Sequence, residues 1–348
     1  MPRRIPCGKV TSSLYTSIWG GNMAHPHIHP TNEISSAASK WLASLNPDQL
    51  DKATFEYLDG ERLFWYYPPL NRHGLAIRDM NENQRNLAFS IMETCLDKHA
   101  FSQAKQIIEL ESILGKIESS HGIKSFSRDP ELYYFTVFGN PNANDPWGWR
   151  VEGHHVSLHF SIWKDKVIST TPFFFGTNPA EVKEGPHKGL RVLSEREDLG
   201  FELIQSFDSS QQKQSIIFEE APFDILLYNS SKAFFPKEEG LIGSKMSGVQ
   251  KELFMSLIVE YINDVRPEIA QDKLSMVNDM GIDNFHFAWG GGTSKGHKHY
   301  YRIHCGDFIV EYDNRQGDGN HIHSVLRDTE NDFASDVLRD HLMNFHVL

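Results

Sequence analysis

The sequence has few of the features that mark a secreted or membrane-spanning protein. It contains only three cysteines, Cys7, Cys95 and Cys305. Three is an odd number and the spacings are unrelated, which argues against a disulfide framework and fits a reducing compartment. No run approaches the roughly 18 apolar residues of a transmembrane helix, and no apolar run follows the N-terminal arginines. We therefore expect a cytoplasmic protein with no membrane partner.

Positive charge is also scarce. The 348 residues include 34 Lys and Arg against 46 Asp and Glu, a formal net charge of −12, and the only basic run is "MPRR" at the start. Such a field repels polyanions. We expect no nucleic-acid partner.

Several catalytic signatures are missing as well. There is no GxGxxG opening a helix after a strand, no Walker A motif, no GxSxG elbow and no HExxH. The glycines of "WGGGTSKG" (289–296) lack the ending of a phosphate loop and favour a turn. Cys305 in "HCGD" fits no pattern of cysteine nucleophiles. The common nucleotide-binding and serine or cysteine hydrolase classes are therefore disfavoured.

The remaining pattern predicts a single large α+β domain over residues 35–348, after a flexible His- and Pro-rich tail at 1–34. Helical signals dominate from about 35 to 121, with Asn46 and Asn81 as expected N-caps. Strand signals follow, then helices, strands and a last helix. This order is not a strict strand–helix alternation, so we expect a mixed or mostly antiparallel sheet with helices packed on it. No linker and no internal repeat is apparent. The expected ranges are helices at 195–207, 248–262, 267–280 and 333–344, and strands at 131–139, 149–163, 166–176, 284–290, 299–306, 307–314 and 321–328.

Histidine is what the chain has in abundance. The sequence holds 18, and most of them are clustered. Outside the tail the clusters comprise His154, His155 and His159, then His297, His299, His304, His321 and His323. Clustered imidazoles favour a metal or catalytic site, because neutral imidazole is a common ligand of transition metals.

The stretch "GHHVSLHF" (153–160) divides its histidines if 149–163 is one strand. Alternate side chains of a strand share a face. His154 would then lie on the same face as Arg150 and Glu152, and His155 would belong to a polar row on the other face. At most one of the two neighbours would reach a given ion. We favour His155, with the row of His154 as the rival.

"NHIHS" supplies a second pair. On a strand His321 and His323 face one side with Cα atoms roughly 6.5 Å apart. Two nitrogens at that spacing can converge on one zinc ion at ~2.0–2.1 Å. Nearby, Glu311 interrupts an apolar run, and burial of a carboxylate is costly unless it is paired or metal-bound. A salt bridge to Arg302 or Arg150 is the simpler interpretation of Glu311.

Long segments of the chain are identified as similar to one known family. "RLFWYYPPLNRHGLAIRDM", "RDPELYYFTVFGNP", "WGWRVEGHHVSLHF", "TPFFFGTNPAEV" and "HYYRIHCGDFIVEYDNRQGDGNHIHSVLRD" resemble the domain of unknown function 3500 (DUF3500) family. The resemblance spans about residues 40–345 and implies no activity. It implies a set of characteristic histidines that match His154, His155, His299, His321 and His323. His159, the tail histidines and Cys305 lie outside that pattern.

These observations lead to a metal-dependent enzyme, with a hydrolase preferred. One divalent transition metal, zinc or iron first and copper as a further option, would activate water for attack on a small, anionic substrate. Arg150, Arg302 and Arg327 would bind that substrate. The expected metal ligands are His154, His155, His299, His321 and His323, and the expected catalytic residues are Glu152, Arg150 and Arg302.

Three alternatives stay open. Iron or copper would favour an oxidoreductase. A closed coordination shell would indicate a non-enzymatic protein that binds a metal or a small ligand. A hydrogen-bonded network of His, Glu and Arg with no metal would make the cluster structural.

Overall fold

A computed structural model describes residues 30–123, 128–142 and 144–336. The predicted tail at 1–34 lies mostly outside these residues, and its last part, from residue 30, opens a helix instead. The predicted helix at 333–344 also lies largely outside them, and its described start is a 3₁₀ turn at Asp332–Ala334. No helix within the described ranges is long and apolar enough to cross a membrane.

The chain folds as the predicted α+β domain around one open, mixed sheet of thirteen strands in its described part. The strands run in the order β1-β3-β4-β5-β7-β13-β12-β11-β10-β8. Three short strands pair with members of this row: β2 with β3, β6 with β5 and β9 with β10. Their bounds are β1 (Thr54–Phe55), β2 (Leu75–Ala76), β3 (Tyr134–Phe138), β4 (Trp147–Gly153), β5 (Val156–Trp163), β6 (Lys166–Ser169), β7 (Phe173–Thr177), β8 (Ile216–Phe218), β9 (Leu241–Ile242), β10 (His286–Gly291), β11 (His299–Cys305), β12 (Phe308–Arg315) and β13 (His321–Asp328).

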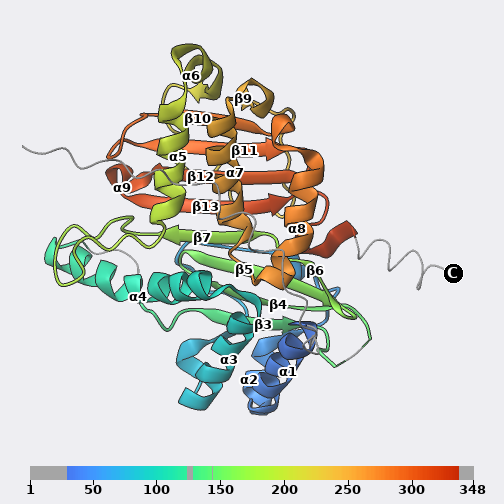
Figure 1. The fold of residues 1–348 in the computed structure, drawn as a ribbon. Coiled ribbons are helices and arrows are strands. Elements are labelled where there is room, and N and C mark those ends of the chain that lie inside the picture. Colours follow the sequence, from blue (N-terminus) through green and yellow to red (C-terminus); the bar gives the residue numbers. More distant parts are fainter. Residues whose placement is uncertain (1–29, 124–127, 143, 337–348) are drawn as a thin grey trace, which may run out of the picture.

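The long helices gather on one face of the sheet (Figure 1). Those that precede β3 lie over β3, β4, β5 and β7, and those from the second half lie over β10 to β13. Their bounds are α1 (Pro30–Ala43), α2 (Pro47–Ala53), α3 (Glu82–Cys95), α4 (Lys98–Ser120), α5 (Ser194–Ser206), α6 (Ser209–Ser215), α7 (Gly248–Ile262), α8 (Pro267–Met280) and the short α9 (Gln316–Gly319). The predicted N-caps Asn46 and Asn81 are confirmed, each in a complete capping box.

The structure corrects the expectation that the chain has no internal repeat. The strand order reads the same from either edge: β1, β3, β4, β5 and β7 mirror β8, β10, β11, β12 and β13. In each half the edge strand is parallel to its neighbour, β1 to β3 and β8 to β10. An antiparallel hairpin follows in each, β4–β5 and β11–β12. The two halves meet where β7 pairs with β13, so a pseudo-twofold axis runs through that pair.

Side chains repeat along with the elements. Residues 74–84 and 240–250 each begin with a glycine at positive φ and pass through a short strand and a 3₁₀ turn. Each segment ends in a glutamine that closes a capping box and bonds a second glutamine, Gln84 with Gln49 and Gln250 with Gln211. Few identities accompany this geometry, which is why the repeat is hard to find in the sequence.

The two faces of the sheet differ in chemistry. The helix-covered face is apolar and joins the helices in the main core. The opposite face lies under irregular segments, 56–73 and 219–240, whose Trp65 and Ile225 pack on Phe174 of β7. This second face carries a row of buried polar side chains: Arg150, Glu152, Ser157, His159, Arg302, Glu311, Asp313, His323 and Arg327. This polar row therefore lies under loops and not under helices.

Candidate metal centre

The histidine pair of "GHHV" occupies a hairpin turn. Strands β4 and β5 pair up to Gly153 and Val156, so only His154 and His155 connect them. The predicted single strand at 149–163 is therefore wrong, and with it the assignment of the two histidines to opposite faces of one strand. His155 adopts φ = 66°, a conformation that non-glycine residues seldom take. The turn therefore places both imidazoles beyond the last hydrogen-bonded pair of β4 and β5.

Three imidazole nitrogens converge at this turn. The Nε2 atom of His155 lies 2.8 Å from Nε2 of His321 and 3.2 Å from Nε2 of His323. The last two atoms are 3.1 Å apart. Ligands bound to zinc at ~2.0–2.1 Å in tetrahedral geometry are separated by roughly 3.3 Å. The triangle therefore has close to the size that one ion requires.

A carboxylate fixes the orientation of His323. Its Nδ1 donates to Oδ1 of Asp224 at 2.6 Å, and the hydroxyl of Tyr67 donates to the other carboxylate oxygen at 3.2 Å. With Nδ1 as donor, the neutral imidazole keeps its lone pair on Nε2, directed at His155 and His321. Carboxylate–histidine pairs of this kind accompany metal-ligating histidines.

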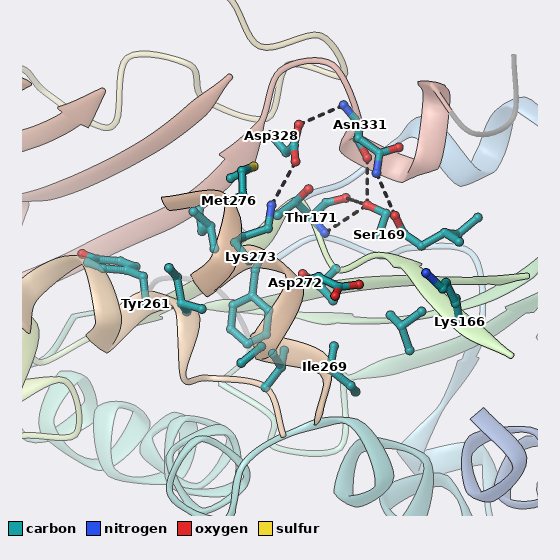
Figure 2. Close-up of a pocket in the computed structure, with 18 residues that line it drawn as sticks. Lys166, Ser169, Thr171, Tyr261, Ile269, Asp272, Lys273, Met276, Asp328 and Asn331 are labelled. Atoms are coloured by element: carbon teal, nitrogen blue, oxygen red, sulfur yellow. Dashed lines mark hydrogen bonds and ion pairs between the residues drawn. The ribbon is translucent and has the colours of Figure 1, made fainter. Parts of the chain in front are cut away.

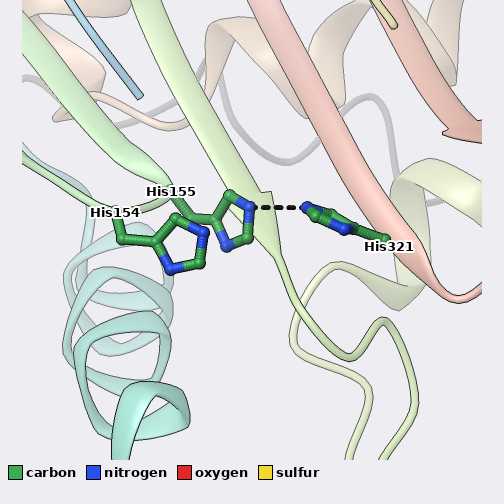
Figure 3. Close-up of side chains that lie close together, drawn as sticks. All are labelled: His154, His155 and His321. Carbon is green, nitrogen blue, oxygen red and sulfur yellow. Dashed lines mark hydrogen bonds between the residues drawn. The ribbon is translucent and has the colours of Figure 1, made fainter. Parts of the chain in front are cut away.

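His154 lies against the triangle from the side. Its ring stacks on that of His155 with 3.7 Å between ring centroids, and its Nδ1 bonds the Glu111 carboxylate of α4. Figure 3 shows His154, His155 and His321 in succession. Ligand atoms of these three lie within 4.8 Å of one another and could hold a metal ion. Two overlapping triads thus share His155 and His321, and we prefer His323 as third ligand because its nitrogen is closer.

Burial keeps His154, His155 and His321 in the form that binds metal. His155 and His321 have pKa values well below the usual range, because burial disfavours the imidazolium and the neighbouring histidines add repulsion. Burial also lowers the pKa of His154, although Glu111 opposes the shift. Neutral imidazoles at neutral pH are the ligand state.

Gly176 of β7 makes room for the His155 ring. A Cβ there would lie 2.8 Å from Cδ2 of His155 and 2.7 Å from the carbonyl oxygen of Ile322. Gly176→Ala is therefore expected to push the ring away, to destabilise the fold by ~1–3 kcal/mol and to weaken metal binding. Zinc titration and urea unfolding check this result. Gly248→Ala meets no atom within 4 Å and should change neither property, and an unaffected Gly176→Ala variant would contradict the packing described here.

The structure places Arg150 and Glu152 in a network that anchors the covering segment. Arg150 donates to the carbonyls of Glu61 and Phe64 and to the Glu61 carboxylate. The Glu152 carboxylate lies 3.6 Å from Nε of Arg150 and 3.4 Å from Nε2 of His159. Burial alone would raise the pKa of Glu152, but the charge of Arg150, the interaction with His159 and the charge of Arg72 bring it to about 2. Neither residue belongs to the histidine triangle.

Arg302 and Arg327 anchor other loops. Arg302 pairs with Glu239 at 3.0 Å. Arg327 pairs with Asp332 at 2.7 Å and donates to the carbonyl of Ser230. Both arginines are buried and each already has a carboxylate partner, so we base no anion binding on them.

His299 and Glu311 also lie apart from the triangle. His299 is on the helix-covered face, stacked between Trp289 and Tyr312. Glu311 bonds the hydroxyl of Tyr300 and two backbone amides of the covering loop, and Arg302 is its cross-strand neighbour without a hydrogen bond to it. We therefore leave His299 and Glu311 out of the proposed centre.

The sequence did not indicate two residues of the site, Glu111 and Asp224. Glu111 stands in the apolar stripe of its helix, four residues after Ile107 and three before Leu114, and a buried carboxylate there was a usable signal. Asp224 lies in the irregular segment "APFDILL", where no periodicity indicates which side chain is buried. Only the fold brings Asp224 to His323.

Two cavities bear on where a ligand could enter. The one in Figure 2, about 300 Å³, lies between β6 and α8 and is mostly apolar, and its Lys273 is paired with Asp328. No residue of the histidine cluster lines it. The other, about 240 Å³, is lined by His154 and Glu111, and is the better candidate for access to the cluster.

Comparisons with known proteins supply a family and no activity. The family model described as "Protein of unknown function (DUF3500)" matches residues 28–335. No curated protein and no solved structure matches the chain.

Proposed function

Since the chain belongs to the DUF3500 family, whose description assigns no activity, we propose a function from the site alone. His155, His321 and His323 hold one divalent transition metal, zinc or iron first, and the centre hydrolyses a small molecule. The observation that supports this proposal is the triangle of Nε2 atoms, 2.8–3.2 Å on a side.

The number of ligands supports hydrolysis. Structural zinc sites take four protein ligands, whereas catalytic sites take three and keep a position for water. Water bound to zinc has its pKa lowered to about 7 and attacks a carbonyl or a related centre as hydroxide. Three converging imidazoles match the catalytic arrangement, and His154 stands where it could contact a substrate.

Two other functions use the same triangle. If iron or copper binds there, oxidative chemistry replaces hydrolysis. If His154 enters as a fourth ligand, the shell closes and the protein binds metal without catalysis.

Tag-free protein analysed for metals by mass spectrometry, then stripped and reloaded, tests the proposal. We expect about one zinc per chain, and ester or amide hydrolysis across a substrate panel that disappears in the stripped protein and returns with zinc. Stoichiometric iron with oxygen-dependent turnover would replace the hydrolase by an oxidoreductase. A metal-loaded protein that is inert in both assays would favour the binding protein.

Asp224→Asn tests the carboxylate behind the centre. The substitution keeps the size of the side chain and removes the charge that orients His323 through Nδ1. We expect zinc affinity to fall about 10- to 100-fold, measured by competition with a chromophoric chelator. Asp283→Asn, at an exposed position, should leave the affinity unchanged. An equal affinity in both variants would exclude a role for Asp224 in positioning His323.

A further inference from the structure

The cavity beside His154 lies next to the proposed centre. It is lined by Pro69, Leu70, Asn71, Arg72, Glu111, Asp129, Leu132, Tyr133 and His154, and measures about 240 Å³. His154 is at the same time in ring contact with His155. A molecule in this cavity therefore lies one imidazole away from the metal ligands.

The other sides of the triangle are largely closed. The Tyr67 ring lies 4.8 Å from that of His323, and Phe174 lies 5.6 Å from it. Gly176 leaves no free space next to His155. His321 alone is partly exposed, on the side of α9, and this gives the one competing approach within the described chain.

The charges of the cavity favour particular ligands. Glu111 and Asp129 contribute two carboxylates, bonded to His154 and to Arg78. Outside the lining, the Arg128 guanidinium lies 3.4 Å from Nδ1 of His154. Arg72 brings the only arginine in the lining, but its guanidinium donates to the carbonyls of Leu70, Tyr66 and Gly153, and Glu152 lies 3.8 Å from its Nε. The charged groups of the lining are thus bonded within the protein, so an uncharged molecule is favoured over an ion.

The apolar part of the lining limits size and polarity. Pro69, Leu70 and Leu132 form the walls, and the exposed Asn71 is a polar group at the mouth. Pockets for drug-sized ligands start at roughly 300 Å³, so this cavity suits smaller molecules.

We infer that this cavity is the substrate subsite of the metal centre and that it takes small uncharged molecules with a hydrogen-bond donor, not carboxylates or phosphates. His154 contacts the bound molecule. This inference rests on the proposed function and names the substrate class of the same site.

Cobalt-substituted protein gives a test that needs no known substrate. Visible absorption reports cobalt binding and the binding of added ligands: 4-methylimidazole, which is uncharged at pH 8.5, and azide, an anion. We expect methylimidazole to bind more tightly than azide. Asn71→Trp, which fills the mouth, should weaken methylimidazole binding at least about tenfold while the cobalt content is kept.

Matched variants identify the route. His73→Trp is the first control. His73 lines a neighbouring cavity of about 640 Å³, which shares Leu70, Asn71 and Arg72 with the first cavity but does not include His154. Glu181→Trp is the second control, because Glu181 lies beside Asn320, next to the exposed side of His321. Both should keep methylimidazole affinity within about twofold. Leu70→Trp repeats the test if Asn71→Trp does not fold, as judged by circular dichroism.

The outcomes separate the two proposals. Weakening by Glu181→Trp, with no effect of Asn71→Trp or Leu70→Trp, would place the entrance at His321 and overturn the subsite. Tighter binding of azide than of methylimidazole would overturn the substrate class. Failure of the wild-type protein to bind cobalt would instead refute the metal centre itself.

Discussion

His321→Ala combined with His323→Ala is expected to abolish stoichiometric metal binding. The double variant removes two of the three Nε2 atoms that lie 2.8–3.2 Å apart and leaves His155 with no partner in the triangle. His155 and the neighbouring His154 remain, but two imidazoles do not complete a three-ligand site, so we expect affinity to fall at least about a thousandfold. Metal analysis of tag-free protein and competition with a chelator measure this loss.

The matched control removes two histidines that lie elsewhere. His121 and His187 are exposed, and their double alanine variant should keep the full metal content. Stoichiometric metal that persists in the variant without His321 and His323 would place the site elsewhere. Absence of metal in the wild type and in both variants would make the cluster a hydrogen-bonded structural network.

Glu152→Gln is expected to lower the free energy of unfolding by about 3 kcal/mol at pH 7. The carboxylate is buried and lies close to Arg150 and Arg72, while Ser157 and the amide of Tyr66 donate to it. The substitution keeps the size of the side chain but removes the carboxylate beside the buried Arg72 and leaves Arg150 with Glu61 alone. Breaking such a pair costs ~3–5 kcal/mol.

The same group predicts an acid dependence. Its pKa falls from the usual 4.5 to about 2 in the folded protein. A depressed folded pKa contributes stability above pH 4.5 that is lost as the pH falls toward 2, about 3 kcal/mol in all. Urea unfolding at several pH values should show this loss in the wild type and a smaller loss in Glu152→Gln. Glu219→Gln, at an exposed position, should behave as the wild type; a wild-type slope in Glu152→Gln would contradict the network.

Much of the fold could be predicted from local signals. The helices α7 and α8 and the strand β13 begin and end at the predicted residues, because caps, prolines and apolar periodicity coincide there. The segment 61–75 could not be assigned in the same way. Its aromatic residues indicate a strand, but Arg150 and the polar face hold it as a loop, which is a tertiary effect.

The site could be predicted only in part. The pair His321 and His323 follows from strand periodicity alone. The turn at His154 and His155 does not, because "WRVEGHHVSLHFSIW" alternates through it and lacks the Asn-Gly or Asp-Gly that marks tight hairpins. Its second residue adopts φ = 66° without glycine. Glu111 and Asp224 come from distant parts of the chain and meet the cluster only through the sheet.

X-ray absorption at the metal edge tests the central claim most directly. On tag-free protein as purified, or after loading with zinc, we predict a first shell with three imidazole nitrogens at ~2.0–2.1 Å and one or two further light-atom ligands. The imidazole scattering should disappear in the variant without His321 and His323. A metal shell without imidazole, or a wild-type protein that takes up no metal, would contradict the centre proposed here.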